Sequence, residues 1–333
     1  MPVPRRGGFP ITLLVTGCVG FIGAKVSELL VQRGHQVLGV DNLNTAYDVR
    51  LKQWRLRGLE AMSGFRFTQL DITDRAALAA LLDRYPVAAV VNLAARAGVR
   101  PSVLDPWVYV DTNVTGTLNL LELCRQHAIG KFVLASTSSL YGDGPRPFRE
   151  DQPTDRPLSP YAASKKAAEA LCYAYHHLFG IDVTILRYFT VYGPAGRPDM
   201  SVFRFIRWIA EGDPIILYGD GSQERDFTYV EDIARGTLQA LDPLGYDIIN
   251  LGSDRPVSIR QVIATLEQYL GRTARLDHRP LHPADVRATW ADISRARERL
   301  HWSPQISLED GLRASVAWYE ANRVWASKVS LGQ

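Results

Sequence analysis

Two residues in the middle of the chain have the types and spacing of an acid–base pair. Tyr161 and Lys165 lie four residues apart in the helix-like segment SPYAASKKAAEA, so both side chains leave one face of the helix. A free tyrosine has a pKa of about 10 and is a poor base at neutral pH, but a neighbouring positive charge favours its phenolate form. Tyr161 is therefore a candidate general base and acid, with Lys165 as its electrostatic partner. On an exposed helix the same pair would have no function, so this interpretation depends on what lies nearby.

A cluster of hydroxyl groups precedes this pair in the sequence. The segment ASTSSLYG ends the strand-like run KFVLAS and contains Thr137, Ser138 and Ser139. A hydroxyl at such a strand end can hydrogen-bond a substrate oxygen and support proton transfer. For Ser139 the simpler interpretation is a turn, and Ser138 is a candidate substrate contact. Thr137 is the candidate catalytic hydroxyl, because its position four residues before Tyr141 resembles that of the catalytic hydroxyl in UDP-galactose 4-epimerases.

A glycine-rich segment near the N-terminus follows the strand-like run ITLLV and opens a helix. Its glycines, Gly17, Gly20 and Gly23, have G-x-x-G-x-x-G spacing, which lets backbone N–H groups approach a pyrophosphate at the helix N-terminus. About twenty residues further on, Asp41 ends the run QVLGV, where a carboxylate can accept hydrogen bonds from ribose hydroxyls. Because this carboxylate would repel a 2′-phosphate, we expect NAD rather than NADP. A bound nicotinamide cation would also favour the phenolate of Tyr161.

The elements that must position these residues alternate between strand-like apolar runs and amphipathic helical segments. This alternation predicts an α/β fold: a Rossmann-type, doubly wound parallel sheet with a smaller α/β C-terminal substrate lobe. A long helix is expected over 160–179 and another near 114–127. Glycine and proline become frequent beyond Thr190, so we assign 11–190 to the NAD-binding domain and 191–225 with 261–325 to the substrate lobe. The segment 226–260 contains the strand-like run DIINLGS and is expected to return to the first domain.

Composition and charge exclude several classes of protein. With 333 residues, 46% hydrophobic and 22% charged, the chain can bury a large core and is not disordered. Its net charge of +3 is spread without a basic stripe, so no nucleic-acid partner is expected. The longest apolar stretch is broken by Asn92 and is too short to span a membrane, so no membrane partner is expected either. Three dispersed cysteines fit a reducing, cytoplasmic location.

Two histidines near the C-terminal end of the chain raise the possibility of a metal site. His278 and His282 lie four apart near Asp277 and Asp285, but Pro280 between them breaks helical spacing. We therefore expect no metal.

Several long segments resemble one family over nearly the whole chain. The strings DNLNTAYDVRLKQWRL, NLAARAGVR, LRYFTVYGPAGRPDM and YGDGSQERDFTYVEDIA, with HPADV and ATWADIS, are similar to those of UDP-glucuronate 4-epimerases. The chain thus resembles an extended short-chain dehydrogenase/reductase of the nucleotide-sugar 4-epimerase group. The resemblance implies NAD as cofactor, a UDP-sugar as substrate and a homodimer in which helices near 118–124 and 163–175 pair. The expected cofactor site comprises Gly17, Gly20, Phe21, Ile22, Gly23, Asp41, Asn42, Asp71, Ile72, Leu93, Ala94, Ala95, Asn113, Tyr161, Lys165 and Tyr188.

The substrate site is expected to involve both lobes. By resemblance, Arg225 would bind the diphosphate, Asp285 would lie near the uridine ribose, and Tyr218 could stack on uracil. We hypothesise that Arg197, helped by Thr190, lies near a substrate carboxylate; the alternatives are that Arg197 binds a phosphate or only covers the surface. The full set of candidates is Val99, Arg100, Thr137, Ser138, Thr190, Arg197, Met200, Ser201, Tyr218, Arg225 and Asp285.

The residues after Thr137 discriminate between related reactions. Sugar 4,6-dehydratases have Asp and Glu where this chain has Ser138 and Ser139, because elimination of water needs an acid and a base. UDP-glucuronate decarboxylases usually have Glu at the position of Ser139. The sequence therefore favours 4-epimerisation of UDP-glucuronate to UDP-galacturonate by transient oxidation at C4. A UDP-galactose or UDP-N-acetylhexosamine 4-epimerase and a UDP-glucuronate decarboxylase stay open as alternatives, and a reductase or a non-catalytic sensor are rivals from other classes.

Overall fold

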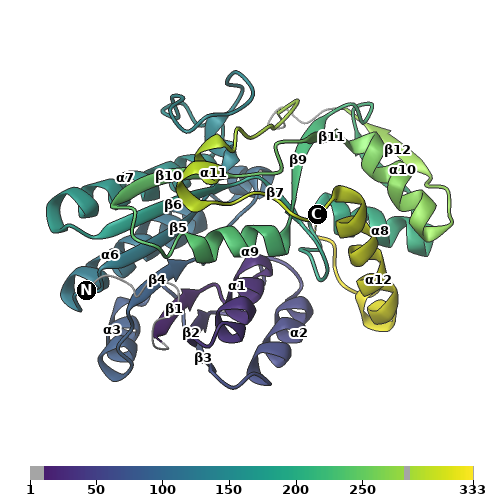
Figure 1. The fold of residues 1–333 in the computed structure, drawn as a ribbon. Helices are drawn as coiled ribbons and strands as arrows, with labels where there is room; N and C mark the ends of the chain where they lie inside the picture. The colour runs from purple at the N-terminus through teal and green to yellow at the C-terminus, as the bar shows by residue number, and fades with distance from the viewer. Residues whose placement is uncertain (1–10, 281–285, 333) are drawn as a thin grey trace.

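A seven-stranded parallel sheet forms the centre of the protein, whose computed structural model describes residues 11–280 and 286–332. The strand order is β10-β6-β5-β4-β1-β2-β3 (Figure 1). The strands are β1 Thr12–Thr16, β2 Gln36–Asp41, β3 Phe65–Gln69, β4 Ala89–Asn92, β5 Lys131–Thr137, β6 Asp182–Tyr188 and β10 Tyr246–Leu251. The chain order reverses between β1 and β4, as in a doubly wound sheet. The predicted fold class is confirmed.

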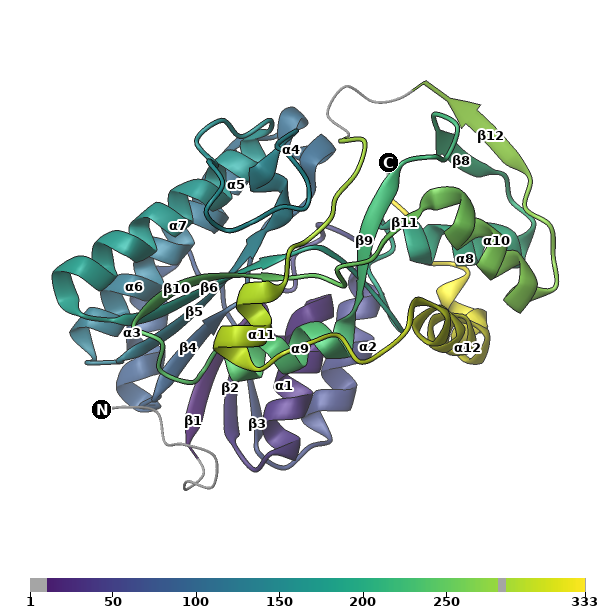
Figure 2. The same ribbon diagram turned by 45° about the horizontal axis from the view of Figure 1, so that its top comes forward.

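Helices cover both faces of this sheet because its strands are apolar on both sides. On β1, Leu13 and Val15 pack in one core cluster, and Leu14 packs in another. The first cluster faces α1 (Phe21–Gln32), α2 (Val49–Glu60) and α9 (Val230–Gln239), and the second faces α3 (Arg75–Arg84), α6 (Gly116–Gln126) and α7 (Pro160–Phe179). Figures 1 and 2 show the two helical layers.

Helix α7 has the bounds predicted from the sequence, because each end carries a clear signal. Ser159 caps its N-terminus by accepting a hydrogen bond from the backbone N–H of Ala162, and Pro160 takes the first position. Gly180 ends the helix in a left-handed conformation with φ of 67°.

The helix expected near 114–127 begins earlier in the structure than the sequence suggested. Helical backbone starts at α5 (Trp107–Tyr109), continues through the π-helical segment η1 (Val110–Thr115) and enters α6. The widened turn places Asn113 with its side chain on the backbone of Arg96, which links this helix to the loop after β4.

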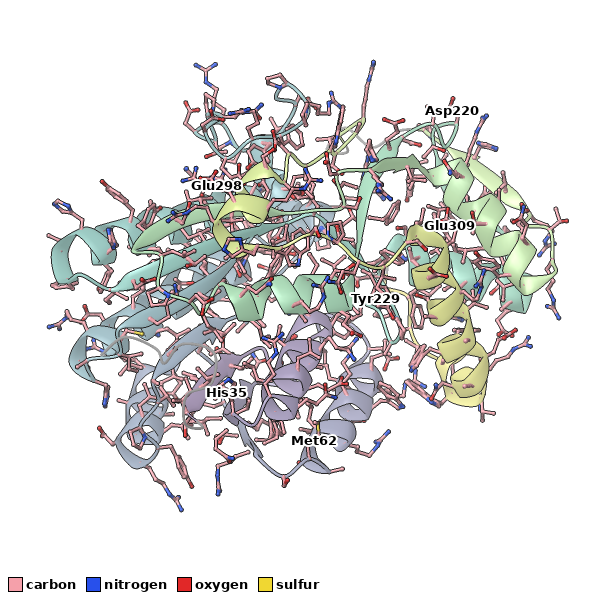
Figure 3. The ribbon with its side chains drawn as sticks, in the orientation of Figure 1. His35, Met62, Asp220, Tyr229, Glu298 and Glu309 are labelled. Atoms are coloured by element: carbon pink, nitrogen blue, oxygen red, sulfur yellow. The ribbon has the colours of Figure 1, made fainter. Side chains whose placement is uncertain are left out.

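The C-terminal lobe has its own core, built from three helices and a small sheet. The helices are α8 Ser201–Glu211, α10 Ile259–Leu270 and α12 Leu308–Ala326, beside the parallel pair β8 Ile215–Tyr218 and β12 Leu276–Arg279. A three-stranded sheet of β7 Thr190–Tyr192, β9 Glu224–Tyr229 and β11 Pro256–Ser258 lies between this lobe and the main sheet. In Figure 3, Asp220 and Glu309 mark the C-terminal lobe, and His35 and Met62 mark the far end of the main domain.

The chain crosses between the lobes more often than a single boundary would require. From the segment 226–260, α9 and β10 lie with the main sheet, whereas β11 pairs with β9. Helix α11 (Ser294–Leu300) lies within the range assigned from sequence to the substrate lobe, yet Ala296 and Leu300 pack in the main-sheet core. Among the described residues, no helix is long and apolar enough to cross a membrane.

Two helical glycines give a matched test of packing. A Cβ on Gly311 in α12 would lie 2.2 Å from the hydroxyl of Tyr192, whereas a Cβ on Gly58 in α2 would meet nothing within 4 Å. We expect Gly311→Ala to lower the free energy of unfolding by about 1–3 kcal/mol through overpacking. Gly58→Ala should raise it by about 0.5–1 kcal/mol, since alanine is the better helix former. Urea unfolding of both variants checks this, and equal shifts of the same sign would contradict the packing described here.

Candidate functional site

One cavity of about 500 Å³ opens at the carboxyl ends of the strands, where ligands bind in doubly wound sheets. It extends from the glycine loop to the C-terminal lobe and brings together most of the predicted site residues. Those that line it are Gly17, Gly20, Phe21, Ile22, Gly23, Asp41, Asn42, Asp71, Ile72, Leu93, Ala94, Ala95, Val99, Thr137, Ser138, Tyr161, Lys165, Tyr188, Thr190, Arg197, Met200 and Arg225.

At Gly17 and Gly23 the turn from β1 into α1 leaves no room for a Cβ atom. Gly17 has φ of 65°, and a Cβ there would lie 2.7 Å from the backbone nitrogen of Ala94. A Cβ on Gly23 would lie 2.0 Å from the carbonyl oxygen of Gly17. The loop therefore packs tightly while its outer side faces the cavity at the N-terminus of α1, which favours an anion. These residues fit the pyrophosphate of a dinucleotide.

The end of β2 forms a polar pocket for a ribose. Asp41 accepts a hydrogen bond from the backbone N–H of Leu43 at 2.8 Å and one from Lys52 Nζ at 3.3 Å. Asn42 donates to Asp71 Oδ2 at 2.6 Å, which connects this pocket to the end of β3. Lys52 also donates to Asn44, and the two residues line the cavity without having been predicted. Because Lys52 offsets the charge of Asp41, repulsion by Asp41 cannot be the whole basis for preferring NAD to NADP.

Helix α7 and strand β5 place the three candidate catalytic groups on one wall of the cavity. Burial raises the pKa of Tyr161, while a hydrogen bond with Thr137 and the charge of Arg197 act in the opposite direction. Lys165 Nζ donates to the carbonyl oxygen of Ala135 at 2.9 Å. Burial therefore favours the neutral phenol of Tyr161, and the hydrogen bond with Thr137 and the charge of Arg197 favour its ionisation.

Burial also disfavours the charged form of Lys165. Its side chain is 4% exposed, and burial lowers its pKa to about 8, although the nearby carboxylate of Glu169 acts to raise it. Lys165 is thus an ammonium at neutral pH that loses its proton in mildly alkaline solution.

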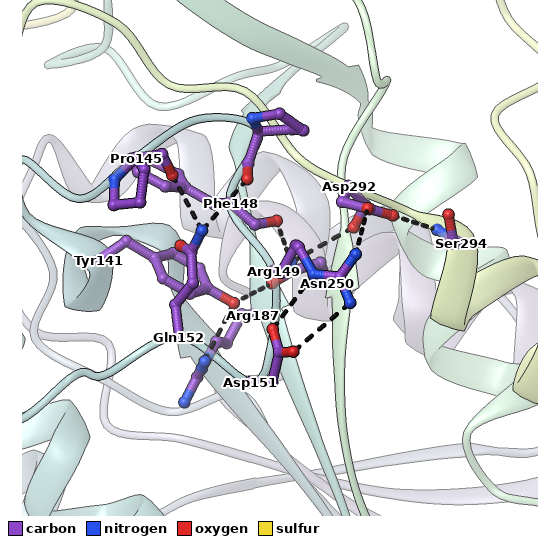
Figure 4. Close-up of polar contacts among 11 residues, drawn as sticks. Tyr141, Pro145, Phe148, Arg149, Asp151, Gln152, Arg187, Asn250, Asp292 and Ser294 are labelled. Atoms are coloured by element: carbon purple, nitrogen blue, oxygen red, sulfur yellow. Dashed lines mark hydrogen bonds and ion pairs between the residues drawn. The ribbon is translucent and has the colours of Figure 1, made fainter.

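A buried polar network holds this wall in place. Glu169 lies one turn after Lys165 on α7 and pairs with Arg187 of β6, with both side chains 2% exposed. Arg187 also donates to the hydroxyl of Tyr141, which donates to Asn250 of β10 at 2.6 Å (Figure 4). The short helix η2 (Ser138–Tyr141) after Thr137 is therefore tied to two strands of the sheet.

Arg197 lines the same cavity, close enough to Tyr161 for its charge to act on the pKa of that phenol. Its Nε and Nη2 donate to the carboxylate of Asp199 at 3.0 and 2.6 Å, and its guanidinium lies 5.6 Å from the ring centroid of Tyr47. Asp199 was not predicted as a site residue. The only indication in the sequence was that it lies two residues after Arg197. This partner fixes the orientation of the guanidinium before any substrate group reaches it.

Some predicted site residues lie away from the cavity. The guanidinium of Arg100 stacks on the ring of Tyr218 at 4.0 Å, so one face of that ring is already covered. Ser201 borders a smaller adjoining pocket that Met200 also lines. Asn113 supports the wall from behind by donating to Ser164 of α7. Asp285 and His282 lie outside the described residues.

Residues from three further places line the cavity without having been predicted as site residues. They come from the loop after β2, the end of β6 and the segment before α11, and are Asn44, Ala46, Tyr47, Phe189, Val286 and Thr289. Their signal in the sequence was only their closeness to strand ends. Within 11–280 and 286–332, no group of three or more His, Cys, Asp or Glu side chains could hold a metal ion.

Comparisons with known proteins match this geometry. UDP-glucuronate 4-epimerase of Thermodesulfobacterium geofontis (strain OPF15) is 58% identical over 310 residues, which cover 93% of this chain and 96% of that protein. UDP-glucuronate 4-epimerase 1 of Arabidopsis thaliana is 41% identical, over 99% of this chain and 81% of that protein. The crystal structure of UDP-glucuronic acid 4-epimerase from Bacillus cereus in complex with UDP-glucuronic acid and NAD has a TM-score of 0.89 at 39% identity, over 94% of this chain and 100% of that chain.

These similarities confirm the resemblance found in the sequence. The model of the NAD dependent epimerase/dehydratase family matches residues 13–252, which include the glycine loop, the Thr137 strand end and the pair Tyr161 and Lys165. The chain therefore belongs to the NAD dependent epimerase/dehydratase family.

Proposed function

We propose that this protein catalyses the NAD-dependent 4-epimerisation of UDP-glucuronate to UDP-galacturonate. The observation that carries the proposal is that Thr137, Tyr161 and Lys165 share one cavity with the glycine loop and with Arg197. Relatives that span nearly the whole chain have the same activity in their names, which supports the choice of substrate.

The residues of the chain supply proton transfer and orientation. NAD, held by the glycine loop and Asp41, would supply a reversible hydride acceptor and donor for either face of C4. Tyr161 takes the proton of the 4-hydroxyl as the hydride leaves C4 and gives a proton back at the end. Thr137 hydrogen-bonds at the same oxygen, and Lys165 keeps the local potential positive while Tyr161 is ionised.

The carboxylate of the substrate makes a side reaction possible once C4 has been oxidised. The 4-keto sugar is a β-keto acid and loses CO₂ when its carboxylate bond aligns with the carbonyl π system. Arg197 is our candidate for holding the carboxylate away from that alignment, and Thr190 lines the same cavity. Ser138 and Ser139 also line the cavity and offer neither the acid nor the base that elimination of water requires.

The UDP part of the substrate is expected to bind at the C-terminal lobe. Arg225 of β9 lines the cavity and is our candidate for the diphosphate. Thr289 lies beside it, with its hydroxyl accepting a hydrogen bond from the backbone of Asp226 at 3.2 Å, so the loop before α11 is anchored to β9. Arg100, Met200, Ser201, Tyr218 and Asp285 remain candidates for the rim of this subsite.

We also propose that the protein is a cytoplasmic homodimer. Apolar side chains follow one face of the continuous helix α5–η1–α6: Trp107 is 77% exposed and Val110 is 47% exposed, and Val114 and Leu118 continue the stripe at helical spacing. Leu178 and Phe179 at the end of α7 are exposed as well. An apolar face of this kind suits a two-fold interface with a second copy. All three cysteines are free and buried, as suits a reducing compartment.

Direct turnover tests the proposed reaction. The purified protein with UDP-glucuronate and catalytic NAD should give UDP-galacturonate, seen by NMR as inversion at C4, without net change in nicotinamide absorbance. Tyr161→Phe removes the acid–base group and should lower kcat by at least about 100-fold while NAD binding stays close to wild type. A wild-type protein that binds NAD but interconverts no UDP-hexuronate would contradict the proposal.

The buried lysine predicts a pH limit on activity. Because the pKa of Lys165 is lowered to about 8, its positive charge is present below that pH and is lost as the pH rises through it. We expect kcat/KM to decline along an alkaline limb centred near pH 8. The bound NAD should be quantified at each pH so that cofactor loss is not mistaken for titration. A profile that is flat between about pH 7 and 10 would rule this titration out.

Charge placed on the apolar stripe tests the dimer. Trp107→Glu should convert a species of twice 37.1 kDa into a 37.1 kDa monomer in analytical ultracentrifugation, because burying an unpaired carboxylate at an interface is unfavourable. Val324 on α12 is 83% exposed and lies far from the stripe in sequence, so Val324→Glu is the matched control and should stay dimeric. The interface is wrong if both variants keep the wild-type mass.

A further inference from the structure

Helix α2 carries a buried arginine that connects the cofactor loop to the loop bearing Arg197. We propose that Arg55 and Tyr47 are positioning residues that hold Arg197 over the carboxylate end of the substrate, and so set the preference for a hexuronate over a neutral hexose. The inference rests on the proposed function and deepens it. Neither side chain need touch the reacting atoms.

Arg55 joins two loops that are far apart in the sequence. Its Nη1 donates to the carbonyl oxygen of Val19 in the glycine loop at 3.1 Å, and its Nη2 donates to that of Ala195 at 2.6 Å. The side chain is only 5% exposed. A buried guanidinium that donates to two carbonyl oxygens holds them at a fixed separation, because leaving either group unpaired in the interior is costly.

The loop that Arg55 holds is a tight turn that needs such an anchor. Gly193 has φ of 150° and Ala195 has φ of 52°. The left-handed conformation raises the free energy of a residue that has a Cβ, such as Ala195, by about 1–2 kcal/mol. Other conformations of this turn are therefore populated unless contacts from outside the turn stabilise the observed one. Arg55 contacts Ala195, which lies two residues before Arg197. This contact therefore fixes the position of the backbone from which the Arg197 side chain extends.

Tyr47 completes the support from the cavity side. Its hydroxyl accepts a hydrogen bond from Arg55 Nη1 at 2.9 Å, and its ring lies 5.7 Å from the Arg55 guanidinium and 5.6 Å from that of Arg197. Lys52 Nζ lies 5.5 Å from the same ring. The ring lines the cavity and offers its negative faces to three cations, so it stabilises Arg197 in a place where like charges alone would drive the cations apart.

This arrangement matters because loss of CO₂ depends on the orientation of one bond. In the 4-keto sugar the C5–C6 bond can break, with its electron pair passing to C5 in conjugation with the C4 carbonyl, CO₂ leaving and a proton then adding at C5. The hydride taken from C4 is not returned in such a turnover, so reduced nicotinamide accumulates in step with the CO₂ released. Small displacements of a positioning group have large effects on such competing steps.

The experiment measures product partition and binding preference in the NAD-loaded enzyme. The variants are Arg55→Met, Tyr47→Leu and the milder Tyr47→Phe, with Arg197→Ala as the reference and Arg57→Met as the matched control, since Arg57 is exposed on the same helix. NMR gives the ratio of UDP-4-keto-pentose to UDP-galacturonate. Calorimetry gives the Kd of UDP-glucuronate and of UDP-glucose, and a separate titration gives the Kd of NAD.

We expect the first two variants to behave like a weaker Arg197→Ala. Their keto-pentose fraction should rise by about 5-fold or more, and their preference for UDP-glucuronate over UDP-glucose should fall by about 10-fold. NAD affinity should change by less than about 3-fold in the Tyr47 variants and by more in Arg55→Met, because Arg55 also bonds to Val19 of the glycine loop. Arg57→Met should match the wild type. Tyr47→Phe, which keeps the ring but loses the bond to Arg55, should shift both ratios in the same direction by a smaller factor.

Unchanged ratios would overturn the inference. If Arg55→Met and both Tyr47 variants keep the wild-type partition and preference, or lose affinity for both sugars by the same factor, the two residues do not position Arg197. If Arg55→Met fails to fold, the Tyr47 variants decide the matter by the same two ratios. Failure of the proposed function is distinguishable, because the wild-type enzyme itself would then produce no UDP-galacturonate, and the inference would fall with it.

Discussion

The buried ion pair of Glu169 and Arg187 is the interaction on which the geometry of the site depends. It joins α7 to β6, and Ser136 of β5 donates to the same carboxylate at 2.6 Å, so three elements meet at one buried charge. Thr137 follows Ser136, and Lys165 precedes Glu169 by one helical turn. Removing one partner would leave the other charge uncompensated in the interior, which is strongly destabilising. The pair thus fixes the distance between the strand that carries the hydroxyl and the helix that carries the phenol.

The electrostatics of the site follow from the same burial. Burial disfavours the ionised forms of both Tyr161 and Lys165, raising the pKa of the first and lowering that of the second. Three groups oppose this: Thr137 and Arg197 favour the phenolate of Tyr161, and Glu169 favours the ammonium of Lys165. The site is therefore poised so that a modest additional positive charge in the cavity favours proton loss from Tyr161, which is the condition that C4 oxidation requires.

Much of this arrangement could be predicted from the sequence, because its signals are local. Ser159, Pro160 and Gly180 mark the ends of α7, and the glycine spacing after β1 marks the dinucleotide loop. Arg55 and Lys52 could not be predicted, since α2 is rich in charged residues and looks like a solvated surface helix. Their burial results from contacts with loops distant in the sequence, as the bond of Arg55 to Ala195 shows. The π-helical turn around Asn113 was missed for a similar reason, because its partner lies on another element.

Helix α2 makes the two binding functions of the cavity mechanically dependent on each other. Lys52 on this helix bonds to Asp41 at the ribose end, and Arg55, one turn later, bonds to Val19 in the glycine loop and to Ala195 beside the sugar end. A shift of α2 that loosened the cofactor pocket would therefore also move the loop that carries Arg197. Because a rigid helix transmits such a shift over a turn without bending, the proposed role of Arg55 makes the sugar preference of this chain depend partly on a side chain of α2.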